Sequence, residues 1–188
     1  AAEVTQDMRR RAKAVNFGIV YGISDFGLSR DLGIPVSEAK QYIELYFNRY
    51  PGVKRYIENI IIKAREQGYV TTLLNRRRYL PEVNSSNRNI RGFGERAAMN
   101  TPIQGSAADI IKLAMLEVSD KIKKASLKAK MILQVHDELI FEVPKNELEI
   151  AKDIIRCAME EAYKLDVPLK VDVKVGTNWY DMEEVLRK

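Results

Sequence analysis

Apolar residues in the first 67 positions recur every three or four residues, which is the period of amphipathic helices. Clusters of Gly, Pro and Ser interrupt this pattern and divide it into separate helices. The predicted helices cover residues 5–23, 28–32, 37–50 and 53–67, separated by breaks at 24–27, 33–35 and 51–52. Ser37 is predicted to cap the third helix, and Gly68 to end the fourth.

Two short strands are predicted next, over residues 69–74 and 78–80, around a turn at Asn75-Arg76-Arg77. Residues 84–89 are rich in Ser and Asn and predict a loop, which is the candidate domain boundary. The first part of the chain is therefore predicted to be a mostly helical lobe.

The second part opens on a long helical pattern over residues 90–124, with Pro102 or Gly105 as the expected site of a bend. Two apolar runs, residues 131–135 and 139–143, flank a polar turn and predict a β-hairpin.

A further helix is predicted over residues 146–165, and the alternating residues 167–175 predict a half-exposed strand. Strands and helices in this order predict an antiparallel sheet backed by helices. The fold class is therefore predicted to be α+β, with the helical lobe first.

Composition excludes few classes of protein. The chain has 188 residues, 46% hydrophobic and 30% charged, and a net charge of +5, which is compatible with a polyanionic partner. Cys157 and His136 are the single cysteine and histidine, which excludes an intrachain disulfide and a Cys/His zinc site. No membrane span or signal-peptide pattern is evident, so a cytoplasmic location is expected.

The segment from Arg9 to Gly22 carries the first candidate chemistry. In a helix, Arg9, Lys13 and Phe17 lie at i, i+4 and i+8 and form one ridge. Two cations followed by an aromatic ring suit a nucleoside triphosphate, because the cations meet the phosphates and the ring meets the base or sugar. A separate stripe is predicted to pack against the protein: Ala12, Val15, Ile19 and Ile23. An ordinary amphipathic surface helix is the alternative.

The turn His136-Asp137-Glu138 of the predicted hairpin is the second candidate site. Two neighbouring carboxylates on rigid strands suit Mg²⁺, which takes oxygen ligands and usually only one or two protein carboxylates. The alternative is that Asp137 only satisfies backbone groups of the turn.

Polar residues of the long helix form the third candidate site. Arg96, Asn100 and Gln104 recur at i, i+4 and i+8, and donors aligned in this way can contact minor-groove acceptors. The turn Arg76-Arg77-Arg78 is a further candidate phosphate contact. Solvated surface residues are the alternative for both.

Three of these segments resemble motifs of the family A DNA polymerases, the bacterial DNA polymerase I type. Residues 9–22 resemble motif B, residues 134–139 resemble motif C, and residues 101–109 resemble the segment between them. The resemblance implies a fingers subdomain at residues 1–87 and the C-terminal part of the palm at residues 88–188. It also implies template-directed addition of deoxynucleotides to a primer 3′-hydroxyl, as in DNA replication and repair.

The resemblance also implies roles for single residues. Arg9 and Lys13 are expected to bind the triphosphate of the incoming nucleotide, and Lys13 to donate a proton to the leaving pyrophosphate. Phe17 is expected to face the sugar and base. Asp137 is expected to ligate catalytic magnesium, with Glu138 in support. Residues expected to contact the primer–template are Tyr21, Ser24, Arg96, Asn100, Gln104 and His136.

The sequence departs from the family pattern in three places. Asn75 replaces the usual Gly, which the turn tolerates because both residues adopt a left-handed backbone. Phe17 stands where some relatives carry Tyr, which is expected to disfavour dideoxynucleotides. No motif A aspartate precedes Arg9, although two-metal transfer needs a second carboxylate.

From this absence we expect the chain to need the upstream portion of the same polymerase, as a covalent or non-covalent partner, to complete a site for two Mg²⁺ ions. The isolated chain is expected to be inactive. The alternative is a non-catalytic nucleic-acid-binding module that retains the polymerase fold.

Overall fold

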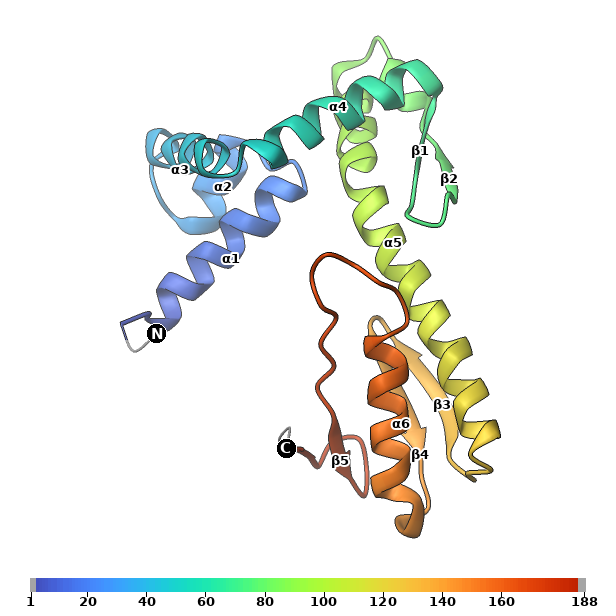
Figure 1. The fold of residues 1–188 in the computed structure, drawn as a ribbon. Helices are drawn as coiled ribbons and strands as arrows, with labels where there is room; N and C mark the ends of the chain where they lie inside the picture. Colours follow the sequence, from blue (N-terminus) through green and yellow to red (C-terminus); the bar gives the residue numbers. More distant parts are fainter. Residues whose placement is uncertain (1–2, 186–188) are drawn as a thin grey trace. The chain divides into compact units, whose positions relative to one another are not determined.

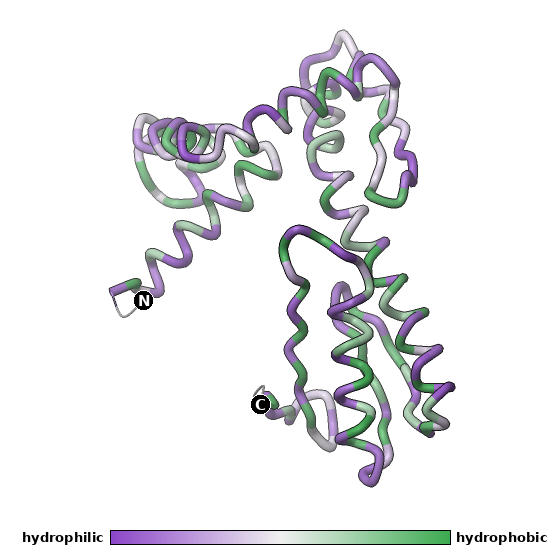
Figure 2. Tube along the Cα trace, viewed as in Figure 1, coloured by the Kyte–Doolittle hydropathy of each residue, from purple (hydrophilic) through white to green (hydrophobic). Residues whose placement is uncertain are grey.

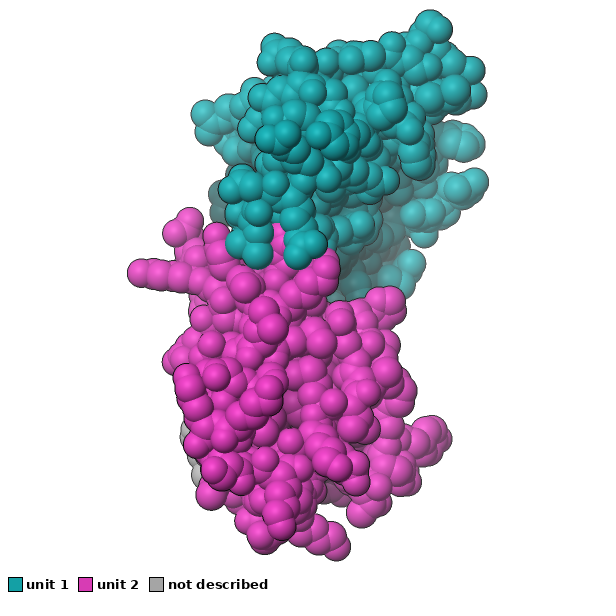
Figure 3. Space-filling model, turned by 90° about the vertical axis from the view of Figure 1, so that its right-hand side faces the viewer, with its two compact units in different colours: residues 1–106 teal, residues 107–188 magenta. Residues whose placement is uncertain are grey.

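A computed structural model describes residues 3–185 of the chain. The chain divides into two compact units, residues 1–106 and residues 107–188 (Figure 3). The division falls inside the long helix α5 (Arg88–Lys124). The predicted boundary between the fingers and the palm, after residue 87, is defined by function and not by compactness, so this division does not test it and it stays a prediction.

The first unit begins with helices joined by short turns (Figure 1). These are α1 (Gln6–Val20), α2 (Asp25–Leu32), α3 (Val36–Arg49) and α4 (Pro51–Gln67). Leu28, Leu32 and Ala39 are buried between α2 and α3, and Val15 of α1 and Ile23 pack against them. The predicted helices are present, and this cluster holds the first three together.

Three predicted helix starts were wrong. The break predicted at residues 51–52 is instead the first turn of α4, which begins at Pro51, because proline suits the first helical position. The Ser24 hydroxyl accepts a hydrogen bond from Gly27 N at 3.1 Å, so α2 begins at Asp25 and the break before it is shorter. Ser37 caps nothing, since α3 begins one residue earlier, after Pro35. Gly68 ends α4 with a left-handed backbone, as predicted.

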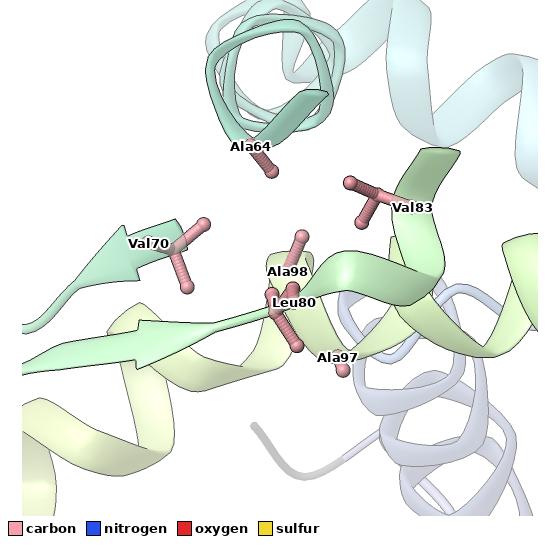
Figure 4. Close-up of a cluster of buried hydrophobic side chains, with 6 residues drawn as sticks. All are labelled: Ala64, Val70, Leu80, Val83, Ala97 and Ala98. Atoms are coloured by element: carbon pink, nitrogen blue, oxygen red, sulfur yellow. The ribbon is translucent and has the colours of Figure 1, made fainter. Parts of the chain in front are cut away.

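A hairpin and a second cluster follow in the same unit. Strand β1 (Tyr69–Thr71) pairs antiparallel with β2 (Arg77–Tyr79), and Asn75 in the turn has φ 61°, as its left-handed tolerance predicts. A short 3₁₀ helix, η1 (Pro81–Asn84), connects β2 to the loop before α5. Figure 4 shows the buried side chains that join these elements to α4 and α5: Ala64, Val70, Leu80, Val83, Ala97 and Ala98.

The second unit holds the C-terminal part of α5 and the predicted hairpin. Strand β3 (Lys130–Val135) pairs antiparallel with β4 (Glu138–Glu142). The short 3₁₀ helix η2 (Lys145–Glu147) then leads into α6 (Leu148–Glu160), which begins and ends inside the predicted 146–165. Figure 2 shows hydrophilic and hydrophobic residues alternating along α6.

A third buried cluster packs the helices of the second unit on this hairpin. Val118 and Ile122 come from α5, Ala151 and Ala158 from α6, and Met131 and Phe141 of the hairpin pack against them. An antiparallel hairpin covered by helices confirms the α+β class.

The predicted strand over residues 167–175 was largely wrong. Regular pairing covers only β5 (Lys174–Gly176), which is antiparallel to β6 (Met182–Glu184). Val173 extends this pairing, because its carbonyl accepts from Val185 N at 2.9 Å. Residues 167–172 belong to no strand ladder within the described range 3–185, so their backbone groups must be met in other ways. One of these groups is met by a side chain, because Val171 N donates to Glu160 Oε1 at 2.9 Å.

No helix among residues 3–185 is long and apolar enough to cross a membrane.

We predict that Leu28→Ala destabilises the first unit by about 3 kcal/mol, because it leaves a cavity in a fully buried position. Leu45→Ala, at a side chain 63% exposed, is the matched control and changes the free energy of unfolding by less than about 0.5 kcal/mol. Urea denaturation followed by circular dichroism measures both. Equal effects of the two substitutions would contradict the placement of Leu28 in this core.

Candidate functional site

The predicted ridge lies on α1 with its cations exposed. Thr5 caps the helix by accepting from Met8 N at 3.2 Å. Asp7, in the first turn, pairs with Arg10 and Arg11 at 2.7 Å each. These bonds, to Arg10 first and then Arg11, lower the pKa of Asp7, so the carboxylate stays charged at neutral pH.

Arg9 and Lys13 are exposed and make no ion pair among residues 3–185. Asp7 is shared by Arg10 and Arg11, so Arg9 and Lys13 are the cations of α1 that have no carboxylate partner among residues 3–185.

The aromatic part of the ridge continues directly from the cations. Lys13 Nζ lies 5.8 Å from the centre of the Phe17 ring, within the range of a cation–π contact. The Phe17 and Tyr21 rings lie 5.9 Å apart and are tilted by 41°. Both side chains remain partly open to solvent, Phe17 at 49% and Tyr21 at 39%. An exposed cation–aromatic row is suited to a ligand that combines phosphate with a flat ring.

The other side of α1 packs on the protein, with one correction to the predicted stripe. Ile19 is buried, and Val15 and Ile23 pack against α2 and α3. Ala12 is exposed, and Ala14 packs against that cluster instead. The buried stripe is centred about a quarter turn away from Ala12, which leaves that residue at the edge.

A left-handed turn ends the ridge and brings it to α5. Gly22 has φ 73°, and Ile23 N closes the turn on Gly18 O at 2.8 Å. A Cβ atom on Gly22 would lie 2.4 Å from Met99 Cε and 3.0 Å from Arg96 Cγ. The end of α1, with Tyr21, therefore lies directly beside Arg96.

Ser24 follows this turn as the N-cap of α2 and is exposed. Its hydroxyl oxygen already accepts a helix N–H, so it has a structural role besides any contact with a ligand.

The predicted polar row on α5 has an exposed and a half-buried part. Arg96 and Gln104 are exposed, and Asn100 is half-buried between them. Asn100 Oδ1 is buried and has no hydrogen-bond partner among the described residues. A buried acceptor without a donor is unfavourable, and this oxygen has almost no accessible surface through which a bound molecule could reach it.

The sequence interpretation missed a cationic cavity that includes Arg96. It has a volume of about 660 Å³, and Arg65 of α4 faces α5 across it. Its lining residues are Arg65, Arg88, Asn89, Arg91, Gly92, Glu95 and Arg96. Arg65 pairs with Glu95, so Arg88, Arg91 and Arg96 give the cavity a positive excess. The signal available in the sequence was the spacing of these three arginines on one helix face.

In the second unit, the β3–β4 loop consists of His136 and Asp137 alone, because Val135 pairs with Glu138. His136 has φ 55°, which is uncommon outside glycine. Gln134 Nε2 donates to His136 O at 3.0 Å and supports this conformation. All three predicted residues, His136, Asp137 and Glu138, are exposed at the tip.

The hairpin tip fits one part of a magnesium site. Two adjacent carboxylates are the correct ligand type for Mg²⁺, which often takes only one or two from a protein. Residues 3–185 contain no group of three or more His, Cys, Asp or Glu side chains that could hold a metal ion. Asp137 and Glu138 could therefore hold the ion only together with oxygens from elsewhere, such as phosphates, water or a further carboxylate.

The candidate residues fall in both compact units. The first unit holds Arg9, Lys13, Phe17, Tyr21, Ser24, Arg96, Asn100 and Gln104, and the second holds His136, Asp137 and Glu138. Within the first unit, the structure brings the end of the α1 ridge and the start of the α5 row together at Gly22.

Comparisons with known proteins agree with the motif resemblance. A family model described as DNA polymerase family A matches residues 1–181. DNA polymerase I of Bacillus caldotenax and that of Bacillus subtilis (strain 168) are each 60% identical over 179 residues, or 95% of this chain. The chain spans only 20% of the length of these curated relatives.

A solved structure shares the fold. It is the polymerase domain of Pol1 from M. smegmatis in complex with DNA primer-template and dNTP, with a TM-score of 0.87 and 51% sequence identity. The match covers 90% of this chain and 30% of that one.

We predict that Gly22→Ala destabilises the fold more than Gly68→Ala. Both glycines have a left-handed backbone, at φ 73° and 74°, so alanine costs each position about 1 kcal/mol. Only Gly22 also meets other atoms, since a Cβ at Gly68 has nothing within 4 Å. The expected additional loss at Gly22 is about 1 kcal/mol, from displacement of the Met99 side chain. Urea denaturation of both variants measures it, and equal losses would show that Gly22 does not hold the α1–α5 approach.

Proposed function

The chain belongs to DNA polymerase family A, and we propose that it supplies the fingers, residues 1–87, and the C-terminal part of the palm, residues 88–188, of a template-directed DNA polymerase. The reaction adds a deoxynucleotide to a primer 3′-hydroxyl, with pyrophosphate as the leaving group. The observation that carries the proposal is the exposed ridge at α1. It consists of Arg9 and Lys13, which form no ion pair among residues 3–185, and of the rings of Phe17 and of Tyr21, which directly follows the helix. Replication and repair of DNA in the bacterial cytoplasm, at the nucleoid, are the processes that such an enzyme serves.

In this proposal the ridge holds the incoming nucleotide. Arg9 and Lys13 bind the triphosphate, and Lys13 gives a proton to the departing pyrophosphate as its charge develops. Phe17 packs against the sugar and base. The ion pairs of Asp7 support this assignment, because they leave these two cations without a competing carboxylate.

Contacts with the primer–template lie at the end of the ridge and along α5. Tyr21 and Ser24 face the templating base, and Arg96 lies beside them because of the Gly22 contact. Asn100 and Gln104 continue the row along the minor groove, where the exposed Gln104 amide can donate to the acceptors that every base pair presents. In the second unit, His136 contacts the growing primer end.

Asp137 is the proposed protein ligand of catalytic Mg²⁺, with Glu138 supporting it. When bound, the metal supplies Lewis-acid stabilisation of charge on the reacting phosphate and the attacking and leaving oxygens. The two-metal mechanism needs a second carboxylate, which we assign to the upstream portion of the same polymerase. That portion is also the proposed partner for the exposed residues Ile132 and Leu133 of β3, 58% and 46% open to solvent.

We predict that the isolated 188-residue chain does not extend a primer in the presence of Mg²⁺, because it holds only one part of the metal site. Adding the upstream portion of the polymerase as a second chain is expected to restore extension. Asp137→Asn in the restored mixture should lower the rate at least roughly a hundredfold, the scale of a lost metal contact. Gel-based primer extension measures all three.

Lys123→Gln, at an exposed position of the last turn of α5, is the matched control and is expected to extend normally. Robust extension by the isolated chain would contradict the need for a partner. Duplex binding by a stable monomer, with no extension in either mixture, would favour the non-catalytic module instead.

We also predict that Phe17→Tyr makes the restored enzyme incorporate dideoxynucleotides more readily relative to deoxynucleotides. The added hydroxyl places a hydrogen-bonding group where the ring is proposed to face the sugar, while the ring itself is kept. Competition between the two nucleotides in primer extension measures the ratio. An unchanged ratio would contradict the placement of Phe17 against the sugar.

A further inference from the structure

One hydrogen bond ties α1, the helix that carries the ridge, to its neighbour α3. The Tyr46 hydroxyl of α3 donates to Asn16 Oδ1 of α1 at 2.8 Å. Asn16 directly precedes Phe17, and it lies seven residues, or nearly two full helical turns, after Arg9. The bond therefore joins α3 to α1 at the border of the exposed ridge.

Tyr46 is a supported and fully protonated donor. Its ring centre lies 5.0 Å from that of Tyr50 and 6.0 Å from that of Phe47, so neighbouring rings of the same helix hold it in place. Burial first, and then the charge of Tyr50, raise the pKa of the Tyr46 hydroxyl above its ordinary value, which keeps its proton at neutral pH. The bond to Asn16 thus comes from a fixed position on α3.

The bond restrains α1 in a way that the apolar core does not. Ile19 is buried and Val15 packs against the cluster of α2 and α3, and these contacts decide which side of α1 faces the protein. Apolar contacts are non-directional, whereas a hydrogen bond weakens steeply when its angle changes. The Tyr46 bond therefore adds a directional restraint on residue 16, next to the ridge, that opposes rotation of the helix about its buried side.

The ring and the cations of the ridge differ in how exactly the backbone must place them. Arg9 and Lys13 carry their charges on long flexible stems, which adjust to a small shift of the helix. Phe17 has only two rotatable side-chain bonds, and its ring, 49% exposed, reaches a ligand only from the place that the backbone gives it. A shift at residue 16 is therefore expected to affect the Phe17 ring more than the two cations.

We propose that Tyr46 is a positioning residue for the incoming nucleotide, acting through Asn16 to hold the Phe17 ring against the sugar and base. Tyr46 itself does not touch the nucleotide. This inference rests on the proposed function, because it takes the ridge on α1 as the site of a nucleoside triphosphate. Its specific consequence is that the Tyr46 hydroxyl contributes to binding of the nucleoside part and not to binding of the phosphates.

The test compares two ligands of the 188-residue chain by isothermal titration calorimetry: dATP, and inorganic tripolyphosphate, which has neither sugar nor base. Tyr46→Phe removes only the hydroxyl and is expected to raise the Kd for dATP about fivefold, the scale of one weakened aromatic contact. The Kd for tripolyphosphate should stay within about twofold of the wild type, because the flexible cations still reach it. Tyr50→Phe, which removes the hydroxyl of the neighbouring ring, is the matched control and should change neither value.

Asn16→Ala removes the acceptor of the same hydrogen bond and is a second, independent variant. It is expected to weaken dATP binding about as much as Tyr46→Phe does. The double variant should bind dATP no more weakly than either single variant, because one bond can be lost only once. Thermal melting by circular dichroism accompanies each variant, and binding is compared at a temperature at which all remain folded.

Three results would overturn the proposal: unchanged dATP binding by Tyr46→Phe, an equal loss of tripolyphosphate binding, or additive losses in the double variant. Lys13→Ala separates this failure from a failure of the proposed function, because it should weaken binding of both ligands. If Lys13→Ala changes neither Kd, the nucleotide site itself is wrong. If Lys13→Ala weakens both and Tyr46→Phe weakens neither, only the positioning role is wrong.

Discussion

The left-handed backbone at Gly22 is the constraint on which the first unit depends. It stops α1 at Val20 and turns the chain so that Ile23 reaches the cluster around Leu28. The same residue, having no side chain, lets Met99 of α5 approach the turn. The backbone conformation of this one glycine thus allows α1, which carries the ridge, to approach α5, which carries the polar row. An L-residue with a side chain would be penalised both by its own conformation and by its neighbours.

The distribution of charge on α1 depends on the orientation fixed by that turn. Burial of Ile19 directs one face toward the protein, so the cations must lie on the other. Of these cations, Arg10 and Arg11 form ion pairs with Asp7, whereas Arg9 and Lys13 do not. Helix geometry sets this choice, because Arg10 and Arg11 lie at i+3 and i+4 from Asp7, whereas Arg9 and Lys13 lie at i+2 and i+6 and face away from it. At these exposed positions the ion pairs themselves contribute little stability.

Local rules predicted most of the fold and part of the site. The helices, the end of α4 at Gly68 and the ridge on α1 are all set by residues within about two helical turns of one another. Such local features can be predicted from the sequence alone. The strand predicted over residues 167–175 formed only at its end, because a strand needs a partner elsewhere and residues 167–172 join no ladder in the described range. The spacing of Arg88, Arg91 and Arg96 on α5 was visible in the sequence, but the cavity itself was not, because its other wall includes Arg65 of a different helix.

The hairpin tip is held in a backbone conformation that is uncommon outside glycine. His136 adopts φ 55° although glycine would do so without strain, and such a conformation persists only where its surroundings enforce it. Here the surroundings are the two-residue loop and the hydrogen bond from Gln134 Nε2 to His136 O. Together they fix the backbone position of the residue that follows His136. That residue is Asp137. A carboxylate on a loop this short is held more rigidly than one on a long flexible loop, and this rigidity supports the proposed role of Asp137 as a ligand of Mg²⁺, which demands near-ideal octahedral geometry.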